Sequence, residues 1–238
     1  MSATATVTRS TVTPSTYELV AVDAYRDIHK GIRADLFDLT GIAGRIDPSC
    51  PGDVADLARH VDQTADLLVV HAGHEDTHVG PVMSELLPDL NATIERDHAV
   101  LEGRLEDLRS WARNAVVAPD GETRGEVQRL YIELASFTSA YLAHQDLEER
   151  VVAPELQRVI GPEGVLAIDQ AIVASIPPDQ MATSLALMLP AMNNDDRTEL
   201  LGGMQAGAPP EVFAGVWSLV GSVLEPRDVA VLARRLAI

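Results

Sequence analysis

A pattern of eleven residues occurs twice in the chain, at residues 71–81 and 144–154. Each copy begins with histidine, carries glutamate four positions later and ends with proline. On an α-helix, side chains four positions apart lie on the same face, one turn apart. The imidazole and the carboxylate of each copy can therefore bind the same metal centre. These side chains are His71, Glu75, His144 and Glu148.

Another histidine precedes each copy, within a helical pattern of apolar residues. One stands 42 residues before the first copy and the other 46 residues before the second. The chain thus repeats the order of a single histidine followed by a histidine–glutamate pair. Four imidazoles and two carboxylates suit two first-row metal ions, with the glutamates bridging them. The six predicted ligands are His29, His71, Glu75, His98, His144 and Glu148.

The remaining histidines fit this pattern less well. His60 has no counterpart in the repeat, so we expect it in solvent. His78 aligns with Val151 and is expected at the rim of the site. His74 lies about 60° around the helix from His71, so it is an additional ligand or a partner of a ligand.

Apolar residues recur at helical spacing in four long segments, at about residues 17–45, 54–80, 89–117 and 122–160. Long helices with short connections predict an all-α, up-down-up-down four-helix bundle. Pro81 is expected to end or kink the second helix, because proline removes a backbone donor and clashes with the preceding turn.

Three regions are predicted from these patterns. Residues 1–15 are short and polar and are expected to form a disordered tail. Residues 16–160 form the bundle, and residues 161–238 form a small helical extension divided by prolines and glycines. The extension contains no histidine, and its own sequence indicates no chemistry.

The composition restricts the partners of the protein. Acidic residues number 36 against 18 basic ones, giving a formal charge of −18. Such a surface repels nucleic acid and anionic lipid and favours the uptake of cations.

Cys50 is the only cysteine, so neither an intrachain disulfide nor a thiolate site is expected. We find no signal-peptide pattern and no apolar run of membrane-spanning length, and we expect a cytoplasmic protein.

The order of the six predicted ligands, with Pro81 and Pro154 following, resembles the hemerythrin-like HHE cation-binding family over roughly residues 17–160. Residues 175–224 also resemble the helical segment that follows the bundle in some members. The resemblance implies a left-handed four-helix bundle with two non-haem iron ions, which an oxo group can bridge. Members include oxygen carriers, iron- or oxygen-responsive regulatory modules, and proteins that act on nitric oxide or peroxide.

The chain differs from the oxygen-carrying pattern at two places. Glu102 stands where the third helix of carriers has a second histidine, and the fourth helix spaces its two ligands by four residues instead of five. A fifth histidine is therefore missing, and Glu102, His74 or water can take its place.

We expect a di-iron protein that binds or reacts with O2, hydrogen peroxide or nitric oxide in oxidative or nitrosative stress. Catalase-like decomposition of peroxide is the corresponding enzymatic activity. The first alternative is an iron- or oxygen-responsive regulatory module that signals through its C-terminal helices. The second is an iron-binding stress protein without turnover. The sequence indicates no particular protein partner.

Overall fold

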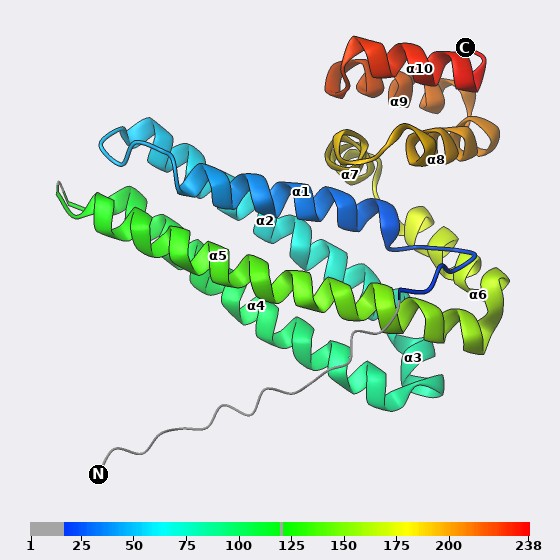
Figure 1. Ribbon diagram of the computed structural model, residues 1–238, viewed down its shortest axis with the longest axis horizontal. Coiled ribbons are helices and arrows are strands. Elements are labelled where there is room, and N and C mark those ends of the chain that lie inside the picture. Colours follow the sequence, from blue (N-terminus) through cyan, green and yellow to red (C-terminus); the bar gives the residue numbers. More distant parts are fainter. Residues whose placement is uncertain (1–16, 120) are drawn as a thin grey trace.

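The computed structural model describes residues 17–119 and 121–238, and every regular element in these ranges is helical (Figure 1). The predicted tail at residues 1–15 lies outside the described residues. The four long helices of the bundle are α1 (Arg26–Ala43), α2 (Pro51–His78), α4 (Pro88–Val117) and α5 (Thr123–Leu147). The predicted all-α bundle with a helical extension is thus confirmed.

Shorter helices connect and extend the bundle. Several begin with proline, which suits the first turn of a helix because the N–H that it lacks would have no helical partner there. The shorter helices are α3 (Gly80–Leu86), α6 (Ala153–Ser175), α7 (Pro178–Ala191), α8 (Asn194–Gly207), α9 (Pro210–Val223) and α10 (Pro226–Leu236).

The first helix begins at Arg26 and not at about residue 17, as its apolar pattern had predicted. The Asp23 carboxylate accepts the backbone N–H groups of Tyr25 and Arg26, which fixes the start of the helix. Residues 21 and 22 instead donate their backbone N–H groups to the side chain of Gln157. Polar contacts with nearby Asp23 and with distant Gln157 therefore override the apolar spacing in this segment.

Both copies of the repeat end at an irregularity. α2 ends at His78 and α3 begins at Gly80, with Pro81 in its first turn, so the predicted break is present. After α5 the chain forms a π-helical segment, η1 (Glu148–Val152), before α6 continues. α6 is itself kinked at Gly161, whose φ of 73° favours glycine.

The core of the bundle contains two large apolar clusters with a polar layer between them, and a smaller third cluster of Val54, Ala115 and Val127. One large cluster includes Ile32, Leu68, Leu101 and Tyr141, and the other includes Tyr25, Val79, Ile94 and Val152. Each of the four chain segments therefore passes from one apolar cluster to the other. The residues between these positions on each segment are those of the repeated pattern.

The C-terminal helices α7 to α10 lie together along the α1 side of the bundle (Figure 1). They have their own core, centred on Leu189, Leu201 and Val220. α7 approaches α1 closely at Gly31, where an added Cβ would lie 3.0 Å from Leu187 Cγ.

No single helix in the described ranges combines the length and the apolar composition needed to cross a membrane. The bent pair Thr123–Ser175 and Pro178–Ala191 meets that criterion together, by length and composition only.

Candidate metal centre

Each helix of the bundle, with its continuation, contributes to one buried polar layer. The four histidines are 9% exposed or less, and both glutamates are similarly buried. Ionisable groups are rarely buried so completely unless they are paired or bind a metal. The structure thus brings together all six residues that the sequence predicted: His29, His71, Glu75, His98, His144 and Glu148.

The histidines form two pairs. The ring centroids of His29 and His71 are 5.3 Å apart, and those of His98 and His144 are 4.9 Å apart. Each pair combines a histidine from a single-histidine helix with one from the repeated pattern. This is the pairing expected if each pair holds one metal ion.

Glu148 faces both pairs. Its Oε2 atom lies 3.4 Å from the Nε2 atom of His29, and its Oε1 atom lies 3.0 Å from the Nε2 atom of His144. One carboxylate oxygen is therefore directed to each pair, which is the arrangement of a bridging carboxylate.

Glu75 repeats this arrangement from the second helix. Its Oε1 atom lies 3.4 Å from His71 Nε2, and its Oε2 atom lies 3.3 Å from His98 Nε2. Donors bound to one first-row ion at about 2.1 Å are about 3.0–3.4 Å apart at ordinary coordination angles. The separations around both glutamates agree with shared cations.

Many of the inward-facing polar atoms have no hydrogen-bond partner. These atoms include both carboxylate oxygens of Glu75, Oε2 of Glu148, and the Nε2 atoms of His29, His71 and His98. An unsatisfied buried polar group costs about 1–3 kcal/mol. A bound cation would satisfy these atoms together. The residues present therefore fit a metal centre, and two groups of donor atoms lie close enough to hold an ion.

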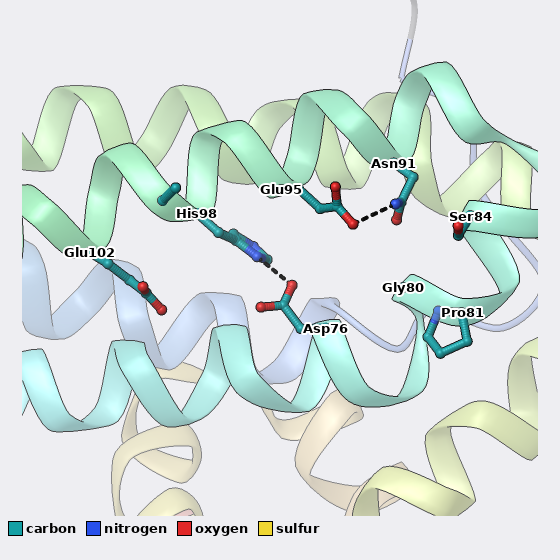
Figure 2. A pocket seen from close by; sticks show the side chains of 9 residues that line it. Asp76, Gly80, Pro81, Ser84, Asn91, Glu95, His98 and Glu102 are labelled. Carbon is teal, nitrogen blue, oxygen red and sulfur yellow. Dashed lines mark hydrogen bonds and ion pairs between the residues drawn. The ribbon is translucent and has the colours of Figure 1, made fainter.

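The outer nitrogen atoms of two histidines are held by neighbouring carboxylates. Nδ1 of His98 lies 2.9 Å from Asp76 (Figure 2), and Nδ1 of His29 lies 2.9 Å from Glu149. If each Nδ1 carries the proton, it donates to the carboxylate and leaves Nε2 free to bind a metal. Asp76 and Glu149 thus orient two of the predicted ligands.

We did not identify Asp76 and Glu149 from the sequence, although the repeat contained a signal for them. Both stand five positions after the histidine that begins each copy, so this position is acidic twice. Each one contacts a histidine on another helix, which the linear pattern does not reveal. Arg33 also donates to Glu149 at 2.7 Å. Burial opposes ionisation of Glu149, but its contacts with His29 and Arg33 lower its pKa to about 2.

The π-helical segment η1 begins at Glu148 and adds a wider turn at the site. Within it, the consecutive residues Glu148 and Glu149 both contact His29, one at each ring nitrogen. π-helical turns are frequent at functional sites, and this one was not predicted from the apolar pattern.

The contacts within the cluster favour protonated histidine paired with ionised glutamate. Burial alone would lower the pKa of His98, but interactions with Glu148 and Glu75 raise it to about 11. Burial likewise opposes ionisation of Glu148, yet His144 and His98 hold the pKa of that carboxyl well below its usual range. A metal cation must therefore displace protons from His98 and His144, whose pKa values are both raised, as it binds.

The other predicted positions lie outside the cluster. His74 and Glu102 belong to neither group of donor atoms that could hold an ion, and Glu102 is exposed. His78 is half-buried, as a rim residue would be. The expectation that His60 is solvated is wrong. Its side chain is half-buried because its Nε2 atom lies 2.8 Å from the Asp35 carboxylate.

The fold and the site together define a class: helical-bundle proteins with a cation-binding centre of histidines and glutamates in their core. The family model of the hemerythrin HHE cation-binding domain matches residues 20–156, which is more than half of the chain. The chain belongs to this family, as the resemblance predicted. Searches among curated proteins and among solved structures found no match.

Proposed function

We propose that the cluster binds two iron ions and that the protein reacts with a small oxygen or nitrogen compound, of which hydrogen peroxide is the first candidate. The bridging arrangement is the observation that carries this proposal. Glu75 and Glu148 each direct one oxygen to each histidine pair. Carboxylates that bridge two imidazole-rich positions inside a bundle favour iron or manganese, and the lack of thiolates disfavours structural zinc.

Bound iron would supply redox chemistry and a Lewis acid at this position. The residues of the chain define its surroundings. Two apolar clusters enclose the polar layer on both sides and limit the access of water. Asp76 and Glu149 hold the rings of His98 and His29 in position. The fifth histidine of oxygen carriers has no counterpart in this chain, where Glu102 stands at its position, and this favours reaction with peroxide or nitric oxide over reversible oxygen transport.

The test combines metal analysis with a peroxide assay. Protein reconstituted with ferrous iron without oxygen should contain close to two irons per chain. It should also decompose hydrogen peroxide, with one peroxide oxidised to O2 and another reduced to water. An oxygen electrode measures the product, and metal-free protein is the control. One zinc per chain, or no iron after reconstitution, would contradict the di-iron proposal. A spectrum that changes with oxygen and reverses under argon would indicate a carrier instead.

A regulatory function is the second candidate, and one contact favours it. Gly31, two residues after His29, lies against α7, and an added Cβ there would be 3.3 Å from Met188 Cα. Five residues before Gly31, Arg26 contacts Glu199 of α8 at 3.0 Å. A change in the position of α1 upon metal binding would therefore reach the C-terminal helices directly. Hydrogen exchange in α7 and α8, compared between metal-free and iron-loaded protein, tests this candidate.

A further inference from the structure

A polar cavity of about 450 Å³ opens between the bend that joins α2 to α3 and the facing side of α4 (Figure 2). The α4 residues that line it stand three or four positions apart and so share one face of the helix. The lining residues are Asp76, Gly80, Pro81, Ser84, Asn91, Glu95, His98, Ala99 and Glu102.

A second, much smaller cavity lies between this opening and the predicted ligands Glu75 and Glu148. Its volume is about 10 Å³, and Glu75 and Glu148 are among its lining residues. That volume corresponds to about one water-sized probe. The two cavities share Asp76, Gly80 and Asn91. These three residues therefore stand between the outer cavity and the space beside Glu75 and Glu148, and we refer to them as the constriction.

The outer cavity is negatively charged. Asp76, Glu95 and Glu102 supply three carboxylates, and neither lysine nor arginine is among the lining residues that the structure describes. Figure 2 shows Glu95 and Glu102 extending from the same face of α4 on either side of His98. Glu95 also accepts a hydrogen bond from the Asn91 amide at 2.9 Å, which holds Asn91 at the constriction.

The inner end of this route carries an independent sign of a ligand. Glu75 is 6% exposed, and neither of its carboxylate oxygens has a hydrogen-bond partner. A series of carboxylates thus runs from the surface to buried oxygen atoms that have no hydrogen-bond partner. Carboxylate oxygens can replace the water molecules of a divalent cation one after another. Anions would be repelled along the same route.

We propose that this cavity is the route by which a divalent metal cation reaches the cluster, with Glu95 and Glu102 attracting the hydrated ion and the Gly80–Asn91 constriction admitting it. The inference rests on the proposed metal-binding function and adds the path of loading. The route affects the rate at which metal is taken up, whereas the six predicted ligands determine the final metal content.

The charge of the route is tested by the double variant Glu95→Gln/Glu102→Gln. Glutamine keeps the acceptor that Asn91 uses and removes two negative charges. Metal-free protein is mixed with ferrous iron under argon, and free iron is measured with a chromogenic chelator at timed intervals. At low ionic strength we expect the rate of uptake to fall about threefold to tenfold, and this difference to diminish as salt increases.

The matched control is Asp107→Asn/Glu211→Gln, which changes the net charge by the same amount. Both residues are exposed and lie outside the cavity, on α4 and α9. This variant should load at the wild-type rate. Equal rates in both double variants would overturn the proposed route. If wild-type protein itself fails to hold iron, the proposed function fails and not the route.

The constriction is tested by Gly80→Ala. An added Cβ would lie 3.7 Å from Glu75 O and 4.0 Å from Asn91 Oδ1, so the fold has room for it. The methyl group would nevertheless reduce the small space that these residues line, which holds about one water-sized probe. We expect slower uptake at every salt concentration, with the same final iron content as wild type. Wild-type uptake rates in this variant would contradict the position of the constriction.

Discussion

At the scale of single residues, Glu148 has the most connections in the cluster. Its carboxylate lies within 4 Å of His29, His98 and His144, and it is 1% exposed. Three of the four bundle segments therefore meet at one side chain. Its removal affects both histidine pairs, whereas the loss of one histidine affects a single pair.

We predict that Glu148→Ala binds at least one iron fewer per chain than wild type. The substitution removes a predicted bridge and leaves the surrounding imidazoles without their anionic partner. Elemental analysis after reconstitution under argon measures the effect. His60→Ala is the control and should keep full metal content, because His60 contacts Asp35 and none of the predicted ligands. Full iron content in both variants would show that the assignment of Glu148 is wrong.

His60 has a structural function that the sequence did not indicate. Its ring lies 2.8 Å from Asp35 on α1, and Thr64 donates to the other oxygen of the same carboxylate at 2.6 Å. The contact with Asp35 raises the pKa of His60 above its ordinary value, although burial opposes this. A protonated His60 therefore links α1 to α2.

Because the folded pKa is raised, this stabilisation is fully present below pH 6.5, the ordinary pKa of histidine. It is lost as the pH rises through the folded pKa. We predict that His60→Gln lowers the melting temperature more at pH 5.5 than at pH 9. Thermal unfolding followed by circular dichroism at both pH values provides the measurement. An equal loss at both values would show that the charge of His60 does not contribute.

At the scale of helices, the contact between α1 and α7 depends on a residue without a side chain. An added Cβ at Gly31 would lie 3.0 Å from Leu187 Cγ and 3.3 Å from Met188 Cα. The leucine side chain can move, but the backbone of Met188 cannot do so easily. Glycine thus permits close packing of these two helices at the cost of a weaker helix interior.

We predict that Gly31→Ala lowers the free energy of unfolding by about 1–3 kcal/mol, the usual cost of overpacking. Gly103→Ala is the matched control, because Gly103 also lies inside a bundle helix and an added Cβ there meets nothing within 4 Å. The control should be more stable than wild type by about 0.5–1 kcal/mol, since alanine is the better helix former. Urea unfolding measures both. Equal stabilisation by the two substitutions would indicate that α7 can move to accommodate the added methyl group with no loss of stability.

At the scale of the whole molecule, α6 belongs with the bundle in its contacts. Val165 is buried in the apolar cluster that includes Val79 and Val152, and Ile168 and Ile172 pack against the same cluster. These residues follow the boundary predicted at residue 161. The helices α7 to α10 instead bury leucine and valine side chains in a core of their own.

We therefore predict different outcomes for two truncations. A chain that ends at Ser175 should keep the same iron content as the full chain, because every predicted ligand and all of α6 remain. A chain that ends at Gly161 should melt at a lower temperature, since it loses three apolar side chains beside the site. Metal analysis and thermal unfolding compare them. If the chain ending at Ser175 cannot hold iron, the C-terminal helices are needed to complete the centre.

The sequence by itself determined the helical class, the four long segments and the set of six residues that meet in the core. Helical periodicity and the repeated histidine–glutamate spacing are local properties, so they are visible without a fold. It also indicated the break at Pro81, because the effect of proline on a helix is local.

The tertiary structure alone decided which groups meet between helices. Asp76 reaches His98 and Glu149 reaches His29 across segments separated by 22 and 120 positions. The pairing of His60 with Asp35 does not follow from spacing, because Asp35 lies on another helix. The same holds for the contacts of residues 21 and 22 with Gln157, far along the chain. The cavity beside His98 likewise depends on contacts between helices, since its walls come from the bend after α2 and from the facing side of α4.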